Sequence, residues 1–417
     1  MGIIVLTLLA LLTVFNYYRF RDYRYPAFLA SALWLGVLAL YYVSPIPIDS
    51  ISVITLLIFL VIVLAFTGGA ELALILYPGR LATPARRSPV QFVSPRHPRA
   101  KTALLLLSAA LFPFVLARAN AIAQQSGISN WLVGLRIETS DPGASSPYGA
   151  LGNASILSFV TTFLWGIEVG TARKERFQFY FSVAVSAAYA VLGTGRTPFL
   201  LLCVPLLGIS AMRGRLRWKT FLSAGLAFVF VFGAFAVILG KGGSLNSEVS
   251  DNFDSVKKSF TEYAIGSIPA FDQVVRSDPA FQYGTNTFVA GVNLVHRFTG
   301  GALTSPIQRE VNVPFPWNVY TAAQPPFIDF GVIGVIVAFS AIGAMSTYCY
   351  SKAVEGDALH MFYYAVSLFP LAVMTFTDQY FAPFESTLKY LLLGYFYFKV
   401  RQNRQTSRHV VRTETGS

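Results

Sequence analysis

The sequence is poor in charged residues, in cysteine and in histidine. Charged side chains make up 12% of its 417 residues, and there are only two cysteines and four histidines. Cys203 and Cys349 stand alone within apolar segments, so the sequence predicts neither a disulfide framework nor a cysteine metal cluster. The histidines are scattered without the spacing of metal ligands. We therefore expect no metal site and no cofactor.

Motifs for nucleotide binding and for nucleophilic catalysis are also missing. The glycines of 240–244 follow no predicted strand, so they do not form a phosphate-binding loop of the usual kind. No Ser-His-Asp or Cys-His arrangement is suggested by spacing. Lys and Arg outnumber Asp and Glu by 32 to 20, but they gather in short loops between apolar runs. This placement favours membrane topology over nucleic-acid binding.

What the chain does contain is apolar sequence. It is 54% hydrophobic with a mean hydropathy of +0.55, which indicates an all-α polytopic membrane protein. The apolar runs predict eleven spans, at about 3–18, 27–43, 51–76, 102–120, 151–171, 179–192, 199–212, 220–239, 324–350, 358–377 and 387–400. The basic loops lie on the inner side, so the N-terminus is expected outside and the C-terminus inside.

The chain divides into four predicted segments. Residues 1–240 carry the first eight spans, 241–322 form a large outer segment, 323–400 carry the last three spans, and 401–417 form a basic inner tail. The outer segment is not expected to be a disordered linker. Helical spacing predicts an amphipathic helix over 247–264 and short helices over 267–275 and 288–297, followed by extended, proline-rich chain.

One stretch places an arginine between two short apolar runs. Gly193-Thr194-Gly195-Arg196 separates 179–192 from 199–212, and neither run reaches the roughly 20 residues that cross a bilayer. A charge near the bilayer centre costs about 2.5 to 3.5 kcal/mol, so such residues usually face a polar cavity. The glycines are expected to permit a tight turn and close approach of a ligand. The alternative is an interfacial arginine that extends to lipid headgroups.

The outer side carries further groups suited to a polar, anionic substrate linked to the membrane. Arginine binds phosphate with two hydrogen bonds at once, and aromatic rings stack on sugars. The arginines are Arg136, Arg196, Arg276, Arg297 and Arg309; the acids include Glu138, Asp329 and Asp378; the aromatic residues include Tyr148, Tyr283, Trp317, Tyr320 and Tyr380. The competing interpretation for each is a solvated loop charge or an interfacial aromatic residue.

Three places in this layout resemble the O-antigen polymerases of the Wzy type, which polymerise oligosaccharide repeat units of bacterial surface glycans. They are Gly193-Thr194-Gly195-Arg196; Tyr283-Gly284 with Asn293-Leu294-Val295-His296-Arg297; and Asn318-Val319-Tyr320-Thr321 with Asp329-Phe330-Gly331-Val332-Ile333-Gly334. The resemblance covers most of the chain in topology.

The resemblance implies a GT-C-like helical bundle in the bacterial inner membrane, with its active site facing the periplasm and metal-independent glycosyl transfer. A growing glycan on undecaprenyl pyrophosphate would move onto an incoming lipid-linked repeat unit. The partners implied are the lipid-linked donor and acceptor, membrane lipid and a chain-length regulator. Arg196 and Arg297 would stabilise the leaving pyrophosphate, and Glu138, Asp329 and Asp378 are candidates for a catalytic base. The predicted substrate-binding residues are Arg136, Arg276, Tyr283, His296, Arg309, Trp317, Asn318 and Tyr320.

The sequence also departs from this family. His296 stands where the family often has proline, and no two arginines are each followed ten residues later by glycine. Related O-antigen ligases usually have histidine where this chain has Trp317. A ligase that transfers finished glycan to lipid A-core is one alternative function. A transporter or flippase for a lipid-linked sugar is another, although only one broken hairpin is visible where inverted repeats would give two.

Overall fold

The structure is a computed structural model that describes residues 1–44, 50–78, 98–139, 147–215, 262, 264–301, 304, 310–313 and 315–399. Four sequence predictions lie wholly or mainly outside these residues. They are the eighth span at 220–239, the amphipathic helix expected over 247–264, Arg309 and the basic tail 401–417.

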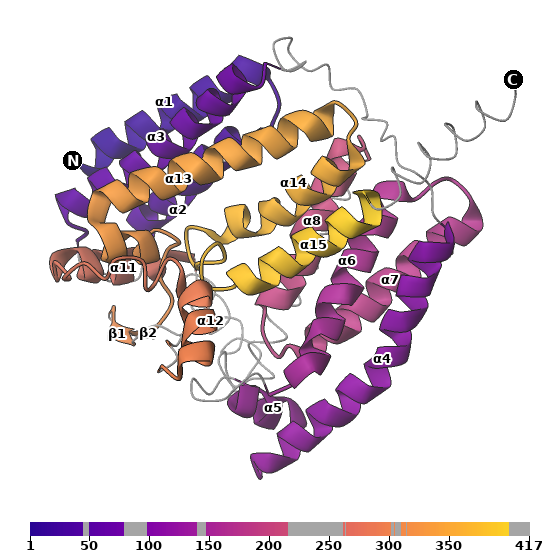
Figure 1. Ribbon diagram of the computed structural model, residues 1–417. Coiled ribbons are helices and arrows are strands. Elements are labelled where there is room, and N and C mark those ends of the chain that lie inside the picture. The colour runs from indigo at the N-terminus through magenta and orange to yellow at the C-terminus, as the bar shows by residue number, and fades with distance from the viewer. Residues whose placement is uncertain are drawn as a thin grey trace, which may run out of the picture. The chain divides into compact units, whose positions relative to one another are not determined.

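Helices make up most of the described chain (Figure 1). The first half contains α1 (Gly2–Phe20), α2 (Pro26–Val43), α3 (Val53–Leu76), α4 (Pro98–Gln125), α5 (Trp131–Thr139), the 3-10 helix η2 (Gly149–Gly152), α6 (Asn153–Glu168), α7 (Arg173–Leu192) and α8 (Thr197–Met212). The second half contains α11 (Ser267–Arg276), α12 (Val289–Thr299), α13 (Gln324–Val354), α14 (Ala358–Val373) and α15 (Phe384–Lys399), with two short strands, β1 (Val311–Asn312) and β2 (Pro316–Trp317).

Six of these helices are long and apolar enough to cross a membrane. They are α1, α2, α3, α4, α6 together with η2, and α13; α8 and α14 are apolar but shorter. The all-α class of a multi-pass membrane protein is therefore supported. The first arm of the hairpin is a longer helix than its apolar run. The helix α7 has 20 residues because it extends through the charged residues Arg173 to Arg176, and it is not among the helices that are apolar enough to cross a membrane; α8 has 16 residues.

The chain folds into two compact units that interleave along the sequence, and each is described by itself. Unit 1 contains Met1–Ser88, Leu222–Ser351 and Ser367–Phe384. Unit 2 contains Pro89–Phe221, Lys352–Val366 and Glu385–Ser417. Arg196 and Glu138 belong to unit 2, whereas Arg297, Asp329 and Asp378 belong to unit 1.

Small residues allow the helices of unit 1 to approach closely. A Cβ on Gly69 of α3 would collide with the backbone of Ser340 in α13, and one on Gly343 of α13 would collide with the backbone of Phe66. Such close crossings are typical of helices packed in membranes. The buried Asn16 amide of α1 also donates to the Ala27 carbonyl of α2 over 3.3 Å, a polar contact of the kind that joins helices in lipid.

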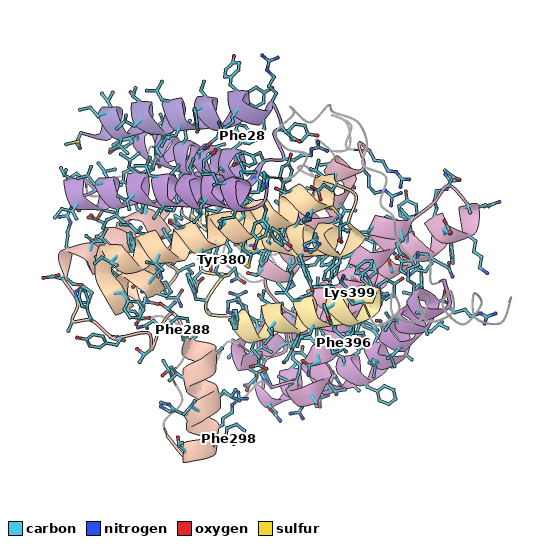
Figure 2. All side chains as sticks on the ribbon, turned by 45° about the horizontal axis from the view of Figure 1, so that its top comes forward. Phe28, Phe288, Phe298, Tyr380, Phe396 and Lys399 are labelled. Carbon is cyan, nitrogen blue, oxygen red and sulfur yellow. The ribbon has the colours of Figure 1, made fainter. Side chains whose placement is uncertain are left out.

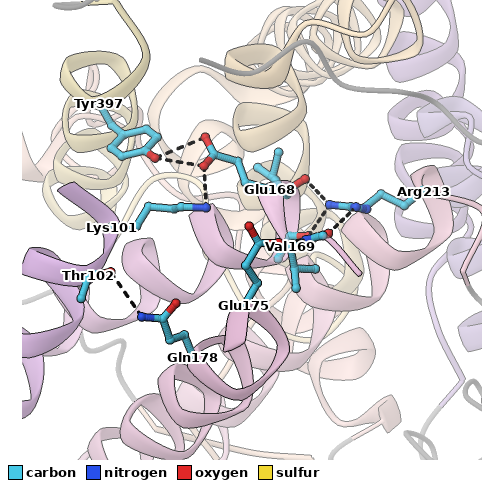
Figure 3. Close-up of polar contacts among 11 residues, drawn as sticks. Lys101, Thr102, Glu168, Val169, Glu175, Gln178, Arg213 and Tyr397 are labelled. Carbon is cyan, nitrogen blue, oxygen red and sulfur yellow. Dashed lines mark hydrogen bonds and ion pairs between the residues drawn. The ribbon is translucent and has the colours of Figure 1, made fainter. Parts of the chain in front are cut away.

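At one end of unit 2, a buried ion pair joins α4 to α6. The Lys101 ammonium lies 2.7 Å from the Glu168 carboxylate and 4.2 Å from the centre of the Trp165 ring, and the Tyr397 hydroxyl also donates to Glu168 (Figure 3). Lys101 directly precedes the predicted span at 102–120, but it lies within α4 and is buried because Glu168 compensates its charge. In the same region Arg213 donates to the carbonyls that end α6, including that of Val169 over 2.7 Å.

Candidate functional site

The turn that joins α7 to α8 carries Arg196. Gly193 ends α7, and Arg196 is the N-cap residue of α8, with Pro198 in the first turn of that helix. Arg196 is half-buried, and its carbonyl accepts the Leu200 N–H as the first bond of the helix. Arg196 therefore stands at the end of α8 where the helix dipole is positive.

Thr194 holds the turn in a strained backbone conformation. Its φ is 49°, in the left-handed region, where a β-branched residue is a clear outlier that costs about 1–2 kcal/mol. Its side chain is 3% exposed. Strain of this kind persists only where the surrounding structure over-determines the backbone, and it is concentrated at functional sites.

Three side chains from the segment before α6 hold the turn in place. Arg136 of α5 donates to the Thr194 carbonyl over 3.0 Å, and the Thr139 hydroxyl lies 3.2 Å from that of Thr194. The Tyr148 hydroxyl donates to the Leu192 carbonyl over 2.8 Å. Burial raises the pKa of Tyr148 to about 12, so this donor keeps its proton at neutral pH. Arg136, predicted to bind substrate, has a guanidinium nitrogen engaged with the turn backbone.

The two glycines of the turn differ in their surroundings. Neither has a positive φ; that conformation falls on Thr194 between them. Gly193 is needed for packing, because a Cβ there would lie 2.7 Å from Pro198 Cγ. A Cβ on Gly195 would meet nothing closer than 3.6 Å. There is thus open space beside Gly195, directly before Arg196, in which a ligand could approach the backbone.

Glu138 lies on α5 between Arg136 and Thr139, the two α5 residues that contact the turn. It is half-buried, and its carboxylate makes no hydrogen bond or ion pair with the part of the chain that the structure describes. Arg196 and Glu138 are therefore two predicted catalytic residues on elements that contact each other in one unit.

In unit 1 two of the predicted stacking residues belong to a small core. Trp317 and Tyr320 are 8% and 5% exposed and pack with Ala270 and Val313. The strands β1 and β2 form an antiparallel hairpin in which Val311 pairs with Trp317, where simple extended chain was expected. Asn318 is exposed. The aromatic rings of this hairpin are occupied by packing, so they support α11.

Arg276, predicted to bind substrate, ties α11 to the start of α3. Its guanidinium donates to Asp272 over 2.6 Å and to the Ser50 carbonyl over 2.6 Å. The Asp272 carboxylate also accepts the Ser52 N–H over 2.9 Å. These contacts fix the outer segment to a membrane helix.

Asp329 anchors the chain that enters α12. This fully buried carboxylate of α13 accepts the backbone N–H groups of Asn286 over 3.1 Å and Thr287 over 2.6 Å, and the Asn286 amide over 2.9 Å. Tyr283, in the same entry chain, is 81% exposed. Farther along α12, Arg297 is exposed and His296 half-buried.

Asp378 organises the turn before α15. Its carboxylate accepts the backbone N–H groups of Tyr380, Phe381 and Ala382 over 2.9 to 3.0 Å. Burial raises the pKa of Asp378, although these three donors act to lower it. Asp329 and Asp378 thus both have carboxylate oxygens engaged with backbone, and Glu138 is the candidate base whose carboxylate is not used in this way by the described residues.

The residues that sequence reasoning missed at this site are Thr139, the contact made by Tyr148, and the helix α5 itself. One signal for α5 was present. Asn130 caps the helix, its side chain accepting the Val133 N–H over 3.3 Å, and asparagine is among the preferred N-cap residues. No sequence signal indicates which carbonyls these side chains would reach.

Searches of protein-family models, of curated proteins and of solved structures found no match to this chain. Among the described residues, no group of three or more His, Cys, Asp or Glu side chains is placed to hold a metal ion.

Proposed function

We propose that this protein is a glycosyltransferase that polymerises lipid-linked oligosaccharide repeat units at the outer face of a bacterial inner membrane. The observation that supports this most is the position of Arg196 at the positive end of α8. It lies on a turn that contains the strained Thr194 and is held by contacts from α5 and Tyr148. A cation added to a positive helix end is unfavourable by itself and suits an anionic ligand. The proposal includes a GT-C-like bundle of eleven spans with a periplasmic N-terminus.

In the proposed reaction, the bond between the anomeric carbon of the donor sugar and the pyrophosphate oxygen breaks, and its electron pair stays with the pyrophosphate. Arg196 stabilises the negative charge that this oxygen gains. The acceptor hydroxyl forms the new bond to the anomeric carbon, and its proton passes to Glu138. Glu138 is preferred over Asp329 and Asp378 because those carboxylates already accept backbone N–H groups. As the resemblance implies, the reaction uses no metal.

The direct test is reconstitution in detergent with defined lipid-linked repeat units. The wild-type protein should produce a ladder of longer glycans, and Arg196→Ala should abolish it while the protein remains at normal levels. Arg176→Ala is the matched control, because Arg176 is an exposed arginine at the other end of the same hairpin helix. Ladders that persist in Arg196→Ala would refute the proposed role.

The same assay separates the alternatives. Transfer of glycan to a lipid A-core acceptor without elongation of repeat units would indicate a ligase. Elongation in detergent, where no membrane separates two compartments, would exclude transport as the whole function. Glu138→Gln should slow elongation without weakening donor binding, because it removes the proton acceptor and keeps the shape of the side chain.

A further inference from the structure

The helix α12 has one face that no part of the described chain covers. Val289 is its only fully buried residue among those described. Phe288, Leu294, Val295 and Phe298 are 62%, 54%, 58% and 84% exposed. At 100° per residue these four side chains lie on one side of the helix, and Asn293 and Arg297 lie on the other. An apolar face of this size is not left in water without a partner.

Phenylalanine rings connect this face to an exposed apolar surface of α13. Val332, Ile333, Ile336 and Val337 are exposed along that apolar helix. The Phe281 ring lies against Gly331, where α13 kinks, and the rings of Phe288 and Phe330 both flank Gly284. Exposed phenylalanine side chains thus lead from a membrane helix to α12, and phenylalanine and leucine are typical of the apolar face of an interfacial helix.

The position and charge of α12 also fit a lipid surface. In both views α12 runs across the direction of α13, and in Figure 2 it stands out from its unit with Phe298 at the end far from Phe288. A helix across a membrane-spanning helix lies along the bilayer surface. Residues 279–301 contain no Asp or Glu, while His296 and Arg297 are basic, which suits the phosphates of lipid headgroups.

We infer that α12 is an interfacial helix that inserts its apolar face, Phe288, Leu294, Val295 and Phe298, into the outer leaflet of the bilayer. Asp329 fixes the start of α12 to α13 through the Asn286 and Thr287 N–H groups, so the helix is held at a set position relative to the membrane. Arg297, on the opposite side, is then kept near the level of the headgroup phosphates. The inference does not depend on glycosyl transfer.

The test uses nitroxide labels on the full chain in nanodiscs of phosphatidylglycerol and phosphatidylethanolamine. Labels are placed singly at Phe298→Cys, at Arg297→Cys on the other side of the same helix, and at Ile333→Cys on α13, with Cys203 and Cys349 replaced by serine. Collision with oxygen, which partitions into lipid, is compared with collision with a water-soluble nickel chelate. All three labelled sites are exposed, so the labels do not disturb packing.

We expect the oxygen-to-nickel collision ratio at Phe298 to be several-fold above that at Arg297 and below that at Ile333. A ratio at Phe298 equal to that at Arg297 would place the face in water and overturn the inference. Low collision with both reagents would show that protein covers the face, either a second copy or another part of the chain, and would overturn it equally. Activity is not measured, so failure here leaves the proposed reaction untouched.

Discussion

The α7–α8 turn and the entry to α12 both contain a residue other than glycine with φ near 49°, but their backbones are held in opposite ways. At the turn, Arg136 and Tyr148 donate to backbone carbonyls. At the α12 entry, the Asp329 carboxylate accepts backbone N–H groups. At the turn, backbone carbonyls accept hydrogen bonds and one of the donors, Arg136, is positively charged. At the α12 entry, backbone N–H groups donate to a buried, negatively charged side chain.

The arginines of the two regions stand at opposite helix ends. Arg196 is the N-cap of α8, so its charge adds to the positive end of a helix dipole. Arg297 lies in the last turn of α12, where a cation is favourable because the dipole is negative there. Helix stability thus accounts for Arg297 without any ligand, but it does not account for Arg196.

The largest expected effect comes from replacing the guanidinium of each arginine by an ammonium group. Arg196→Lys should lower the rate of elongation by about 10²-fold or more, as loss of a positioned donor to developing charge does, because an ammonium cannot bind two oxygens in the same plane. Arg297→Lys should lower it by less than about tenfold, because an exposed charge is screened by water. Equal losses in the two variants, measured at equal protein levels, would show that the two arginines act alike.

Asp329→Asn should produce the next largest effect, on stability. Hydrogen bonds to a charged group contribute about 1.5–3 kcal/mol, and the neutral amide would also turn a donor toward N–H groups. We expect a lower midpoint of thermal unfolding and faster motion of a nitroxide at Phe298→Cys. Glu310→Gln is the control, since Glu310 is exposed and belongs to the same unit as Asp329. An unchanged midpoint would mean that Asp329 does not anchor α12.

Substitutions of Gly193 and Gly195 should distinguish the packing of the α7–α8 turn from the access of a ligand to it. Gly193→Ala should cost about 1–3 kcal/mol, as overpacking does, because its Cβ would meet Pro198 at 2.7 Å. Gly195→Ala should change stability by less than about 0.5 kcal/mol, as surface substitutions do, because the space there is open. If substrate approaches the backbone at Gly195, elongation will fall in the second variant while its unfolding midpoint stays that of wild type.

The presence of the helices could be predicted from the sequence, because a run or a helical repeat of apolar residues is visible without knowing what the helix packs against. The spans at 51–76 and 324–350 appear as α3 and α13, and the short outer helices expected at 267–275 and 288–297 appear as α11 and α12.

The site could be predicted only as far as Arg196 and its turn. The contacts of Arg136, Thr139 and Tyr148 depend on how α5 packs, which no local pattern specifies. Asp329 and Arg276 are outer-side charges in the sequence, yet tertiary structure uses them as anchors.

The smallest expected effect concerns pH. Burial raises the pKa of Tyr148 above its usual 10 to about 12, so the folded state favours the protonated hydroxyl that donates to Leu192. A raised pKa means that the stability it contributes is fully present below pH 10 and is lost as pH rises through 12. Tyr148→Phe removes a hydrogen bond that contributes about 1 kcal/mol. The difference in free energy of unfolding between wild type and Tyr148→Phe should therefore be constant from pH 7 to 9 and shrink only above pH 10. A difference that already falls between pH 7 and 9 would show that the hydroxyl loses its proton in that range and cannot be the donor that holds the turn.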